Sequence, residues 1–163
     1  MTNARRLLGL AFIAAISSDT GAQGALAEVS CTSGPYRLQL PKSYAAIRRM
    51  GQLRRERVVK TEAMETQTFT HRELRFNGLE LVLITSSADR ARYAVARAIV
   101  SSRAWRIGGP LRVGASAKSA LRALHPGGLP ADGELEFTGE RDSIRVNLSR
   151  GRIVDFEYTC AIG

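Results

Sequence analysis

Hydrophobic and polar residues alternate in two stretches of this chain, and a turn interrupts each stretch. Residues 71–86 read HRELRFNGLELVLITS, and residues 133–151 read GELEFTGERDSIRVNLSRG. Strict alternation is typical of a strand with one buried face. The pair Asn77-Gly78 between two such runs is a strong hairpin signal, because a type I′ turn needs two residues that tolerate positive φ. The pattern predicts two β-hairpins, the first with both Asn77 and Gly78 at positive φ.

A further strand is expected after each hairpin. Residues 152–160 alternate and are rich in β-branched and aromatic side chains, which favours a strand. Residues 88–102, ADRARYAVARAIVSS, favour a helix by intrinsic propensity, yet larger side chains alternate with small ones from Tyr93 onward. Because this segment stands where residues 152–160 stand after the second hairpin, we predict a strand from Tyr93 to Ser102. A helix is the alternative.

Apolar residues at helical spacing precede each predicted hairpin. After the N-cap candidate Ser116, apolar residues recur at helical spacing through residue 124. Residues 46–51, AIRRMG, resemble residues 120–125, ALRALH, and short strand-like segments (36–40 and 111–113) precede both. The order helix–strand–strand–strand therefore occurs twice, with a period of about 70 residues. We predict a single α+β domain of two tandem αβββ units, about 36–102 and about 109–160, with helices packed on one face of an antiparallel sheet.

The first 27 residues have the pattern of an export signal. Arg5 and Arg6 precede an apolar run over residues 7–16, and Ala25-Leu26-Ala27 follows. A basic start, an apolar run and an A-x-A site characterise a secretory signal peptide, and the apolar run is too short to span a bilayer. We predict a signal peptide over 1–27 and a periplasmic or secreted mature domain over 28–163. The alternative is a buried N-terminal helix.

Two cysteines, Cys31 and Cys160, lie at opposite ends of the predicted mature chain. An exported protein meets an oxidising compartment, so we predict a disulfide between them. Such a bridge closes nearly the whole domain, for which the chain-entropy model gives about 4–5 kcal/mol. A lipid anchor on Cys31 is the alternative. It is disfavoured because Glu28-Val29-Ser30 lacks the leucine and small residues usual at such a site.

Positive charge is concentrated in one segment. The chain carries 24 lysines and arginines against 15 acidic residues, a net charge of +9, and removing residues 1–27 leaves +8. A positive surface attracts anionic partners, so we expect another protein or an anionic envelope component as partner. The candidate partner-binding residues are Arg48, Arg49, Arg54, Arg55, Arg57 and, outside the segment, Trp105. The alternatives are a solvated helix end and loop for the arginines and a packing role for the tryptophan. Nucleic acid is disfavoured because aromatic residues make up only 6% of the chain and do not interleave with the charges.

No catalytic, cofactor-binding or metal-ligating residue is predicted, and no cofactor is expected. His71 and His125 lack a cysteine or carboxylate at metal-ligand spacing, which makes a surface position the better interpretation. No nucleophile elbow, P-loop or dinucleotide fingerprint occurs. Strand periodicity makes the hairpin glutamates cross-strand partners of arginines, namely Glu73, Glu80, Glu134, Glu136 and Glu140 with Arg72, Arg75 and Arg145.

Residues 109–124 also carry a resemblance. The motif G-x-S at Gly114 to Ser116, followed by a helix, a strand pair and a closing strand, resembles the repeat of the BamE/SmpA-like and β-lactamase-inhibitor-protein-like superfamily. In many members the helix ends in Leu-Gly-x-Pro. Gly51 keeps that glycine in the first unit, whereas His125 stands in its place in the second, and Lys42 stands where the second unit has Ser116. The resemblance implies an exported bacterial α+β module that binds protein without catalysis.

The sequence therefore predicts an exported, non-catalytic protein-binding module, either of inhibitor or immunity type or an envelope accessory. A small-ligand or lipid carrier, or an enzyme with an unrecognised site, is the alternative. An enzyme requires convergent polar groups in one cleft, and a carrier requires an apolar cavity.

Overall fold

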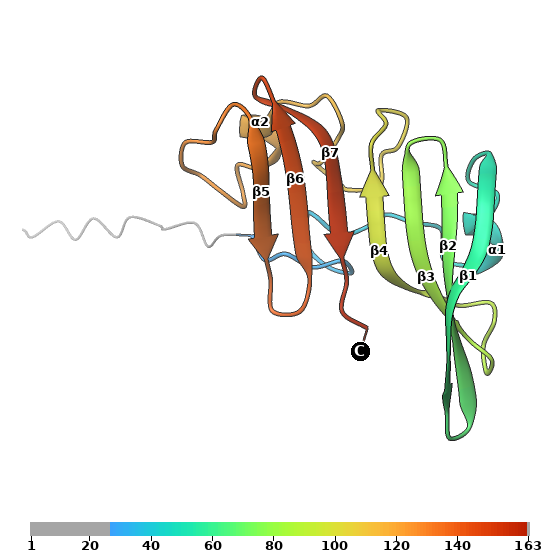
Figure 1. Ribbon diagram of the computed structural model, residues 1–163. Coiled ribbons are helices and arrows are strands. Elements are labelled where there is room, and N and C mark those ends of the chain that lie inside the picture. The colour runs from blue at the N-terminus through green and yellow to red at the C-terminus, as the bar shows by residue number, and fades with distance from the viewer. Residues whose placement is uncertain (1–26, 163) are drawn as a thin grey trace, which may run out of the picture.

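A computed structural model describes residues 27–162 of this protein. In this range, seven antiparallel strands form one sheet (Figure 1). The order across the sheet is β1-β2-β3-β4-β7-β6-β5. The strands are β1 (Leu53–Met64), β2 (Gln67–Phe76), β3 (Leu79–Ser86), β4 (Ala94–Val100), β5 (Gly133–Thr138), β6 (Ser143–Ser149) and β7 (Arg152–Thr159).

The sheet is assembled from two meanders that meet in its middle. Strands β1 to β4 follow one another from one edge inward, and the chain then crosses to the opposite edge and returns through β5, β6 and β7. The seam between the meanders is short, because β4 and β7 pair only from Arg97↔Thr159 to Val100↔Phe156. At the other side of the molecule the β1–β2 hairpin projects beyond the neighbouring strands (Figure 1).

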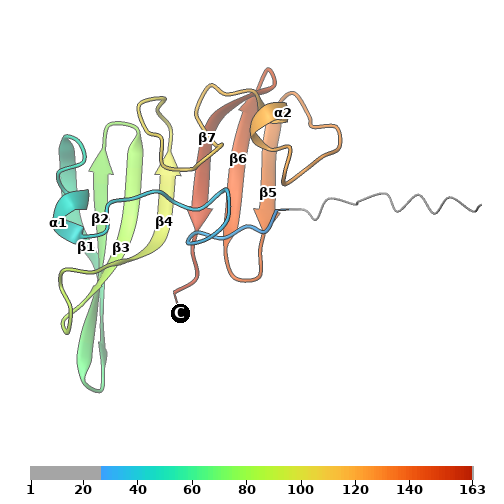
Figure 2. The same ribbon diagram turned by 180° about the vertical axis from the view of Figure 1, so that it is seen from behind.

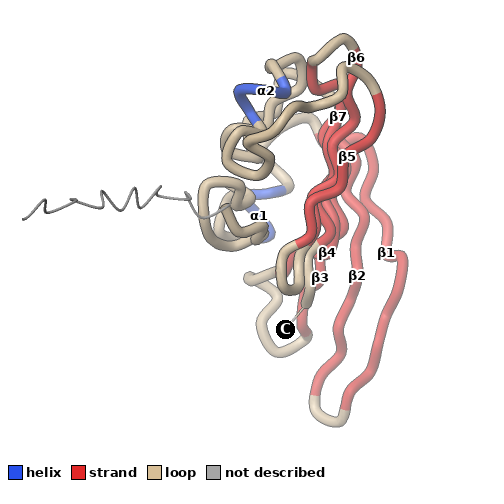
Figure 3. Tube along the Cα trace, turned by 90° about the vertical axis from the view of Figure 1, so that its left-hand side faces the viewer, coloured by secondary structure: helices blue, strands red, loops and turns tan. Residues whose placement is uncertain are grey.

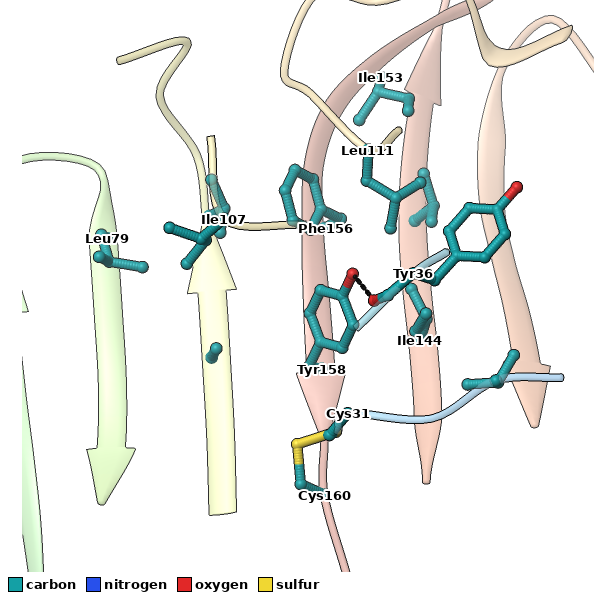
Figure 4. Packing of buried hydrophobic residues seen from close by; sticks show 14 of the residues in the cluster. Cys31, Tyr36, Leu79, Ile107, Leu111, Ile144, Ile153, Phe156, Tyr158 and Cys160 are labelled. Atoms are coloured by element: carbon teal, nitrogen blue, oxygen red, sulfur yellow. Dashed lines mark hydrogen bonds between the residues drawn. A yellow bond between two sulfur atoms is a disulfide. The ribbon is translucent and has the colours of Figure 1, made fainter. Parts of the chain in front are cut away.

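One face of the sheet is covered and the other is open. The covering layer consists of irregular chain and two single helical turns, α1 (Tyr44–Ile47) and α2 (Ala117–Ala120) (Figures 2 and 3). Apolar side chains from alternate strand positions pack beneath this layer into one core. Tyr158, fully buried, donates its hydroxyl to the carbonyl oxygen of Tyr36 at 2.6 Å and so joins the sheet to the layer (Figure 4).

The predicted α+β class is wrong: this is a mainly-β fold. Each helix has only four residues, so no layer of packed helices exists in the described chain. The two αβββ units are wrong as well, because the first helical turn is followed by four strands and the second by three. Apolar residues at helical spacing were present, but Gly51 follows α1 closely and His125-Pro126-Gly127-Gly128 follows α2 closely, and such residues terminate helices.

The unpredicted strand is β1. Its twelve residues are rich in arginine, glutamate and lysine, which favour a helix by propensity, but the segment is extended and pairs with β2 with two register shifts. Backbone pairing in the sheet overrides the local preference. The strand-like segments expected at 36–40 and 111–113 lie outside the sheet, where Leu111 forms only an isolated bridge with Gly108.

The hairpins and the closing strands are confirmed. β2 and β3 are joined at Asn77-Gly78, β5 and β6 form the second hairpin, and the segment from Tyr93 contains strand β4 rather than a helix. The turn type is wrong, because Gly78 has φ +72° while Asn77 is not among the residues with positive φ. A side chain on Gly78 would also meet Ser102 Cβ at 2.2 Å.

The disulfide between Cys31 and Cys160 is confirmed, with Cα atoms 5.9 Å apart (Figure 4). It fastens the covering layer to the end of β7. The carboxylate of Asp142 reinforces this junction by accepting from Cys31 N at 2.7 Å and from Ala161 N at 2.8 Å. A disulfide is typical of proteins in an oxidising compartment. Residues 1–26 of the predicted signal peptide lie outside the described residues.

Candidate functional site: a basic corner beside an ion-paired sheet face

The structure divides the predicted basic segment into paired and unpaired arginines. Arg49, Arg54 and Arg55 are exposed and form no ion pair with any residue in 27–162. Arg48 and Arg57 are each bound to a glutamate. We name as the basic corner the group at the junction of α1 and β1, which consists of Arg48, Arg49, Arg54 and Arg55.

A polar cluster holds the base of this corner in place. Glu56 accepts the hydroxyl of Tyr44 at 2.6 Å and lies 2.8 Å from Arg48 Nε and 3.5 Å from Arg72 Nη1. Burial, followed by the bond to the Glu56 carboxylate, raises the pKa of Tyr44 well above its usual range. Tyr44 therefore stays protonated and keeps donating, which ties the helical turn to β1. The cluster binds Arg48, while the three other arginines of the corner form no ion pair within the part of the chain that the structure describes.

The open face of the sheet carries rows of paired charges across neighbouring strands. Glu73 on β2 is bound by Arg57 of β1 and by Arg75 of its own strand, and Arg75 Nε also lies 3.1 Å from Glu80 of β3. Antiparallel registers Arg57↔Glu73 and Arg75↔Glu80 place these side chains opposite one another, as cross-strand pairing favours.

Glu73 is the anchor of this row because its side chain is only 6% exposed. Burial alone would raise its pKa, but the guanidinium groups of Arg57 and Arg75 outweigh burial and lower it. Its Oε1 makes no hydrogen bond of standard geometry, yet it is in ion-pair contact with Arg75 Nε. That contact satisfies the charge, so Glu73 is an ionised structural anchor.

A second row crosses the seam between the two meanders. Arg97 of β4 donates to Glu157 of β7 at 2.6 Å, and Arg145 of β6 lies between Glu157 and Glu134, 3.4 Å from the latter. The bond to Glu157 is the main cause of the raised pKa of Arg97. These pairs fix side chains across most of the open face, which leaves a broad and preordered charged surface.

The predicted cross-strand partners are thus confirmed in part. Across strands, Arg75 pairs with Glu80 and Arg145 pairs with Glu134, whereas the contact of Arg75 with Glu73 lies within β2. Arg72 instead contacts Glu56 on the covered side of the sheet. Glu136 and Glu140 form no ion pair with any residue that the structure describes, although both are exposed.

Trp105 lies apart from the charges and packs within the protein. Its indole meets the ring of Phe76 edge to face at a centroid distance of 5.5 Å, and its Nε1 donates to the carbonyl oxygen of Asn77 at 2.8 Å. A Cβ on Gly51 would approach the indole to 2.7 Å. These contacts fit the packing role and fasten the chain after β4 to the first hairpin.

The two histidines occupy unrelated places. His71 Nε2 lies 2.9 Å from Glu62 on the projecting hairpin, while His125 Nε2 lies 3.3 Å from the carbonyl oxygen of Gly128. Hydrogen bonds from Lys60 first, and then from His71, lower the pKa of Glu62. Within residues 27–162 no three His, Cys, Asp or Glu residues gather in a group that suits a metal ion.

A groove of about 660 Å³ opens beside the disulfide. Leu38, Leu40, Val95 and the disulfide give it apolar lining, and charged residues of mixed sign stand around it, namely Glu28, Lys42, Glu140, Arg141 and Asp142. Sequence reasoning missed it because the groove forms only when the N-terminal segment, the start of β4 and the β5–β6 loop meet. No sequence signal marks that meeting except the pair of cysteines.

Comparison with known proteins returned no match to any family model, curated protein or solved structure. Neither helical turn, nor any other helix in the part of the chain that the structure describes, has the length and apolar character needed to cross a membrane.

Proposed function

We propose that this protein is an exported, non-catalytic protein-binding module, of inhibitor or immunity type or an envelope accessory, whose partner presents an acidic surface to the basic corner. One observation carries the proposal: three exposed arginines, Arg49, Arg54 and Arg55, form no ion pair within the described chain. Unpaired surface cations steer an acidic partner toward the site and speed association. The resemblance of residues 109–124 to the superfamily of exported binding modules supports the same conclusion.

The open face extends this surface beyond the corner. Arg57, Arg75, Arg97 and Arg145 are already held there by ion pairs with glutamates. Binding at this face therefore orders few additional side chains, and a low ordering cost favours affinity. The disulfide and the export pattern at the N-terminus support a partner in an oxidising compartment. A periplasmic or extracellular protein with an acidic patch fits these properties.

Affinity capture with matched variants tests the proposal. The wild-type exported chain is immobilised beside a triple variant, Arg49→Ser/Arg54→Ser/Arg55→Ser. A control, Arg90→Ser/Arg112→Ser/Arg122→Ser, removes the same charge from exposed arginines elsewhere. A periplasmic protein retained by wild type and control, and lost from the triple variant at about 0.1 M salt, supports the proposal. Equal retention of that protein by the immobilised wild type, triple variant and control contradicts the proposal.

The groove beside the disulfide favours a second candidate, a carrier of a small apolar ligand. Its volume of about 660 Å³ falls within the range of about 300–1,000 Å³ that is usual for small-molecule sites. Native mass spectrometry of the purified exported chain tests this role. A bound small molecule that is lost on Val95→Arg supports the carrier, and bare protein from every preparation contradicts it.

A further inference from the structure

The two outer strands of the sheet, β1 and β5, both have an unpaired edge. Within residues 27–162 no backbone hydrogen bond from outside the β1–β2 and β5–β6 pairs reaches either strand. Open edges carry a row of free N–H and C=O groups that can pair with another strand. In this protein, the edges also differ in charge.

The β1 edge is basic and the β5 end of the sheet is acidic. Residues 48–62 contain six cations and two anions, a net charge of +4, whereas residues 125–162 contain four cations and seven anions, a net charge of −3. The chain as a whole is strongly basic, so the acidic end stands out from its surroundings. Glu136 on β5 is exposed and forms no ion pair in the described chain.

The geometry of the sheet makes the two edges compatible. Every neighbouring pair of its seven strands is antiparallel, so the two outer strands point the same way. A second copy, shifted sideways without turning over, brings its β1 parallel to β5 of the first. Val59 lies at a register shift of β1 and acts as an extra residue there. One register then sets opposite charges face to face and matches the exposed Val58 to the half-buried Leu135, with the pairs Arg55–Asp132, Arg57–Glu134, Val58–Leu135 and Lys60–Glu136.

We propose that the acidic β5 edge of one copy docks against the basic β1 edge of a second copy. This inference rests on the proposed function, since it names an acidic partner for the side of the molecule that carries the basic corner. Like charges oppose a β1–β1 or β5–β5 contact, and charge on an edge strand is a common device against unwanted pairing. The contact is therefore head to tail, which propagates from copy to copy instead of closing as a two-fold dimer.

Salt dependence follows from the distance between the edges. Six strand spacings separate β1 from β5, about 29 Å. At about 0.1 M salt the Debye length is about 10 Å, so facing edges attract while the bulk of the net positive charge is screened. At about 1 M salt the edge pairs are screened as well, and at about 0.01 M the net charge of each copy repels the other. Self-association is thus strongest at intermediate salt.

Charge exchange between the edges tests the contact. One variant, Arg55→Glu/Lys60→Glu, changes strand β1 from a net charge of +2 to −2, and a second, Glu134→Lys/Glu136→Lys, changes strand β5 from −2 to +2. The two edge strands are then both acidic in the first variant and both basic in the second. The exported wild-type chain is expected to show, by sedimentation at about 0.1 M salt, a weight-average mass that exceeds one chain and rises with concentration. Each variant alone is expected to stay monomeric, and an equimolar mixture of the two is expected to associate again. Arg90→Glu/Arg122→Glu, which alters net charge as much as the first variant does, is expected to behave as wild type.

A monomeric wild type at all three salt concentrations overturns the inference, and so does association that survives in either edge variant. Circular dichroism confirms that each variant is folded, and the exposed positions of the exchanged residues favour this. The proposed function has an independent outcome. If the wild type is monomeric but capture of a foreign protein still requires Arg49, Arg54 and Arg55, only the head-to-tail contact is rejected. If self-association occurs while capture is insensitive to these arginines, only the foreign partner is rejected.

Discussion

Removing the disulfide is expected to cost most of the stability of the fold. The bridge joins residues 129 positions apart, and the chain-entropy relation gives about 5 kcal/mol for a loop of that length. We expect Cys31→Ala/Cys160→Ala to lower the free energy of unfolding by about that amount. For a domain of roughly 140 residues, the unfolding entropy is about 0.3 kcal/mol/K, so the melting temperature should fall by about 15–20 °C.

The hydrogen bonds of Asp142 make this prediction more specific. The Asp142 carboxylate accepts from the backbone N–H groups of Cys31 and Ala161, and both groups remain when Cys31 is replaced by alanine. The two ends of the native chain therefore stay together, and the loss of stability arises mainly in the unfolded chain. The unfolded variant is then more expanded, and the urea m-value should rise. Each single Cys→Ala variant should lose about as much as the double variant, because either change opens the loop.

Urea unfolding of the oxidised wild type, the two single variants and the double variant supplies the measurement. A loss below about 2 kcal/mol in the double variant, with an unchanged m-value, would refute the argument that the bridge acts by restricting the unfolded chain.

Three other substitutions test the fold and the open face. Gly78→Ala places a Cβ at a positive φ and against Ser102, so we expect a loss of about 1–3 kcal/mol in chemical denaturation; no change would show that the turn is placed wrongly. Tyr158→Phe removes the hydroxyl that binds the Tyr36 carbonyl and should cost about 1–3 kcal/mol in the same assay, whereas a neutral effect would reject that link. The pKa of Glu73 is lowered in the fold, so its contribution to stability is present above the unfolded carboxyl pKa of about 4.3 and is lost as pH falls through the folded value. Glu73→Gln should therefore destabilise the protein at pH 7 and flatten the decline in stability below about pH 4.3, and a decline as steep as in wild type would contradict this role.

The strands that alternation predicted are those with one covered face. β3 and β6 bury every second residue beneath the covering layer, and that burial is what the sequence pattern records. Strand β1 was not predicted, because both faces of this strand are largely exposed in the projecting hairpin. Most of its side chains are therefore polar, and apolar and polar residues do not alternate along it. The helices were overpredicted because four or five apolar residues at helical spacing also suit a single turn followed by irregular chain.

From the sequence, the basic corner was predictable only as a local concentration of positive charge. The sequence shows the arginines of residues 48–57, but which of them stay free depends on the strand register. Arg57 is neutralised by Glu73 because β1 pairs with β2, and Arg48 is held by Glu56 because α1 lies against β1. The packing of Trp105 on Phe76 likewise requires the chain after β4 to return to the first hairpin.

The association rate of a captured partner tests the central claim most directly. The rate constant is measured for the wild type, for Arg49→Ser/Arg54→Ser/Arg55→Ser and for the control Arg90→Ser/Arg112→Ser/Arg122→Ser, each at about 0.05 M and 0.5 M salt. Steering by the basic corner predicts that, at low salt, the triple variant associates about tenfold more slowly than wild type and control, and that this difference shrinks at high salt. Equal association rates for wild type and triple variant at low salt would contradict the assignment of the basic corner as the partner surface.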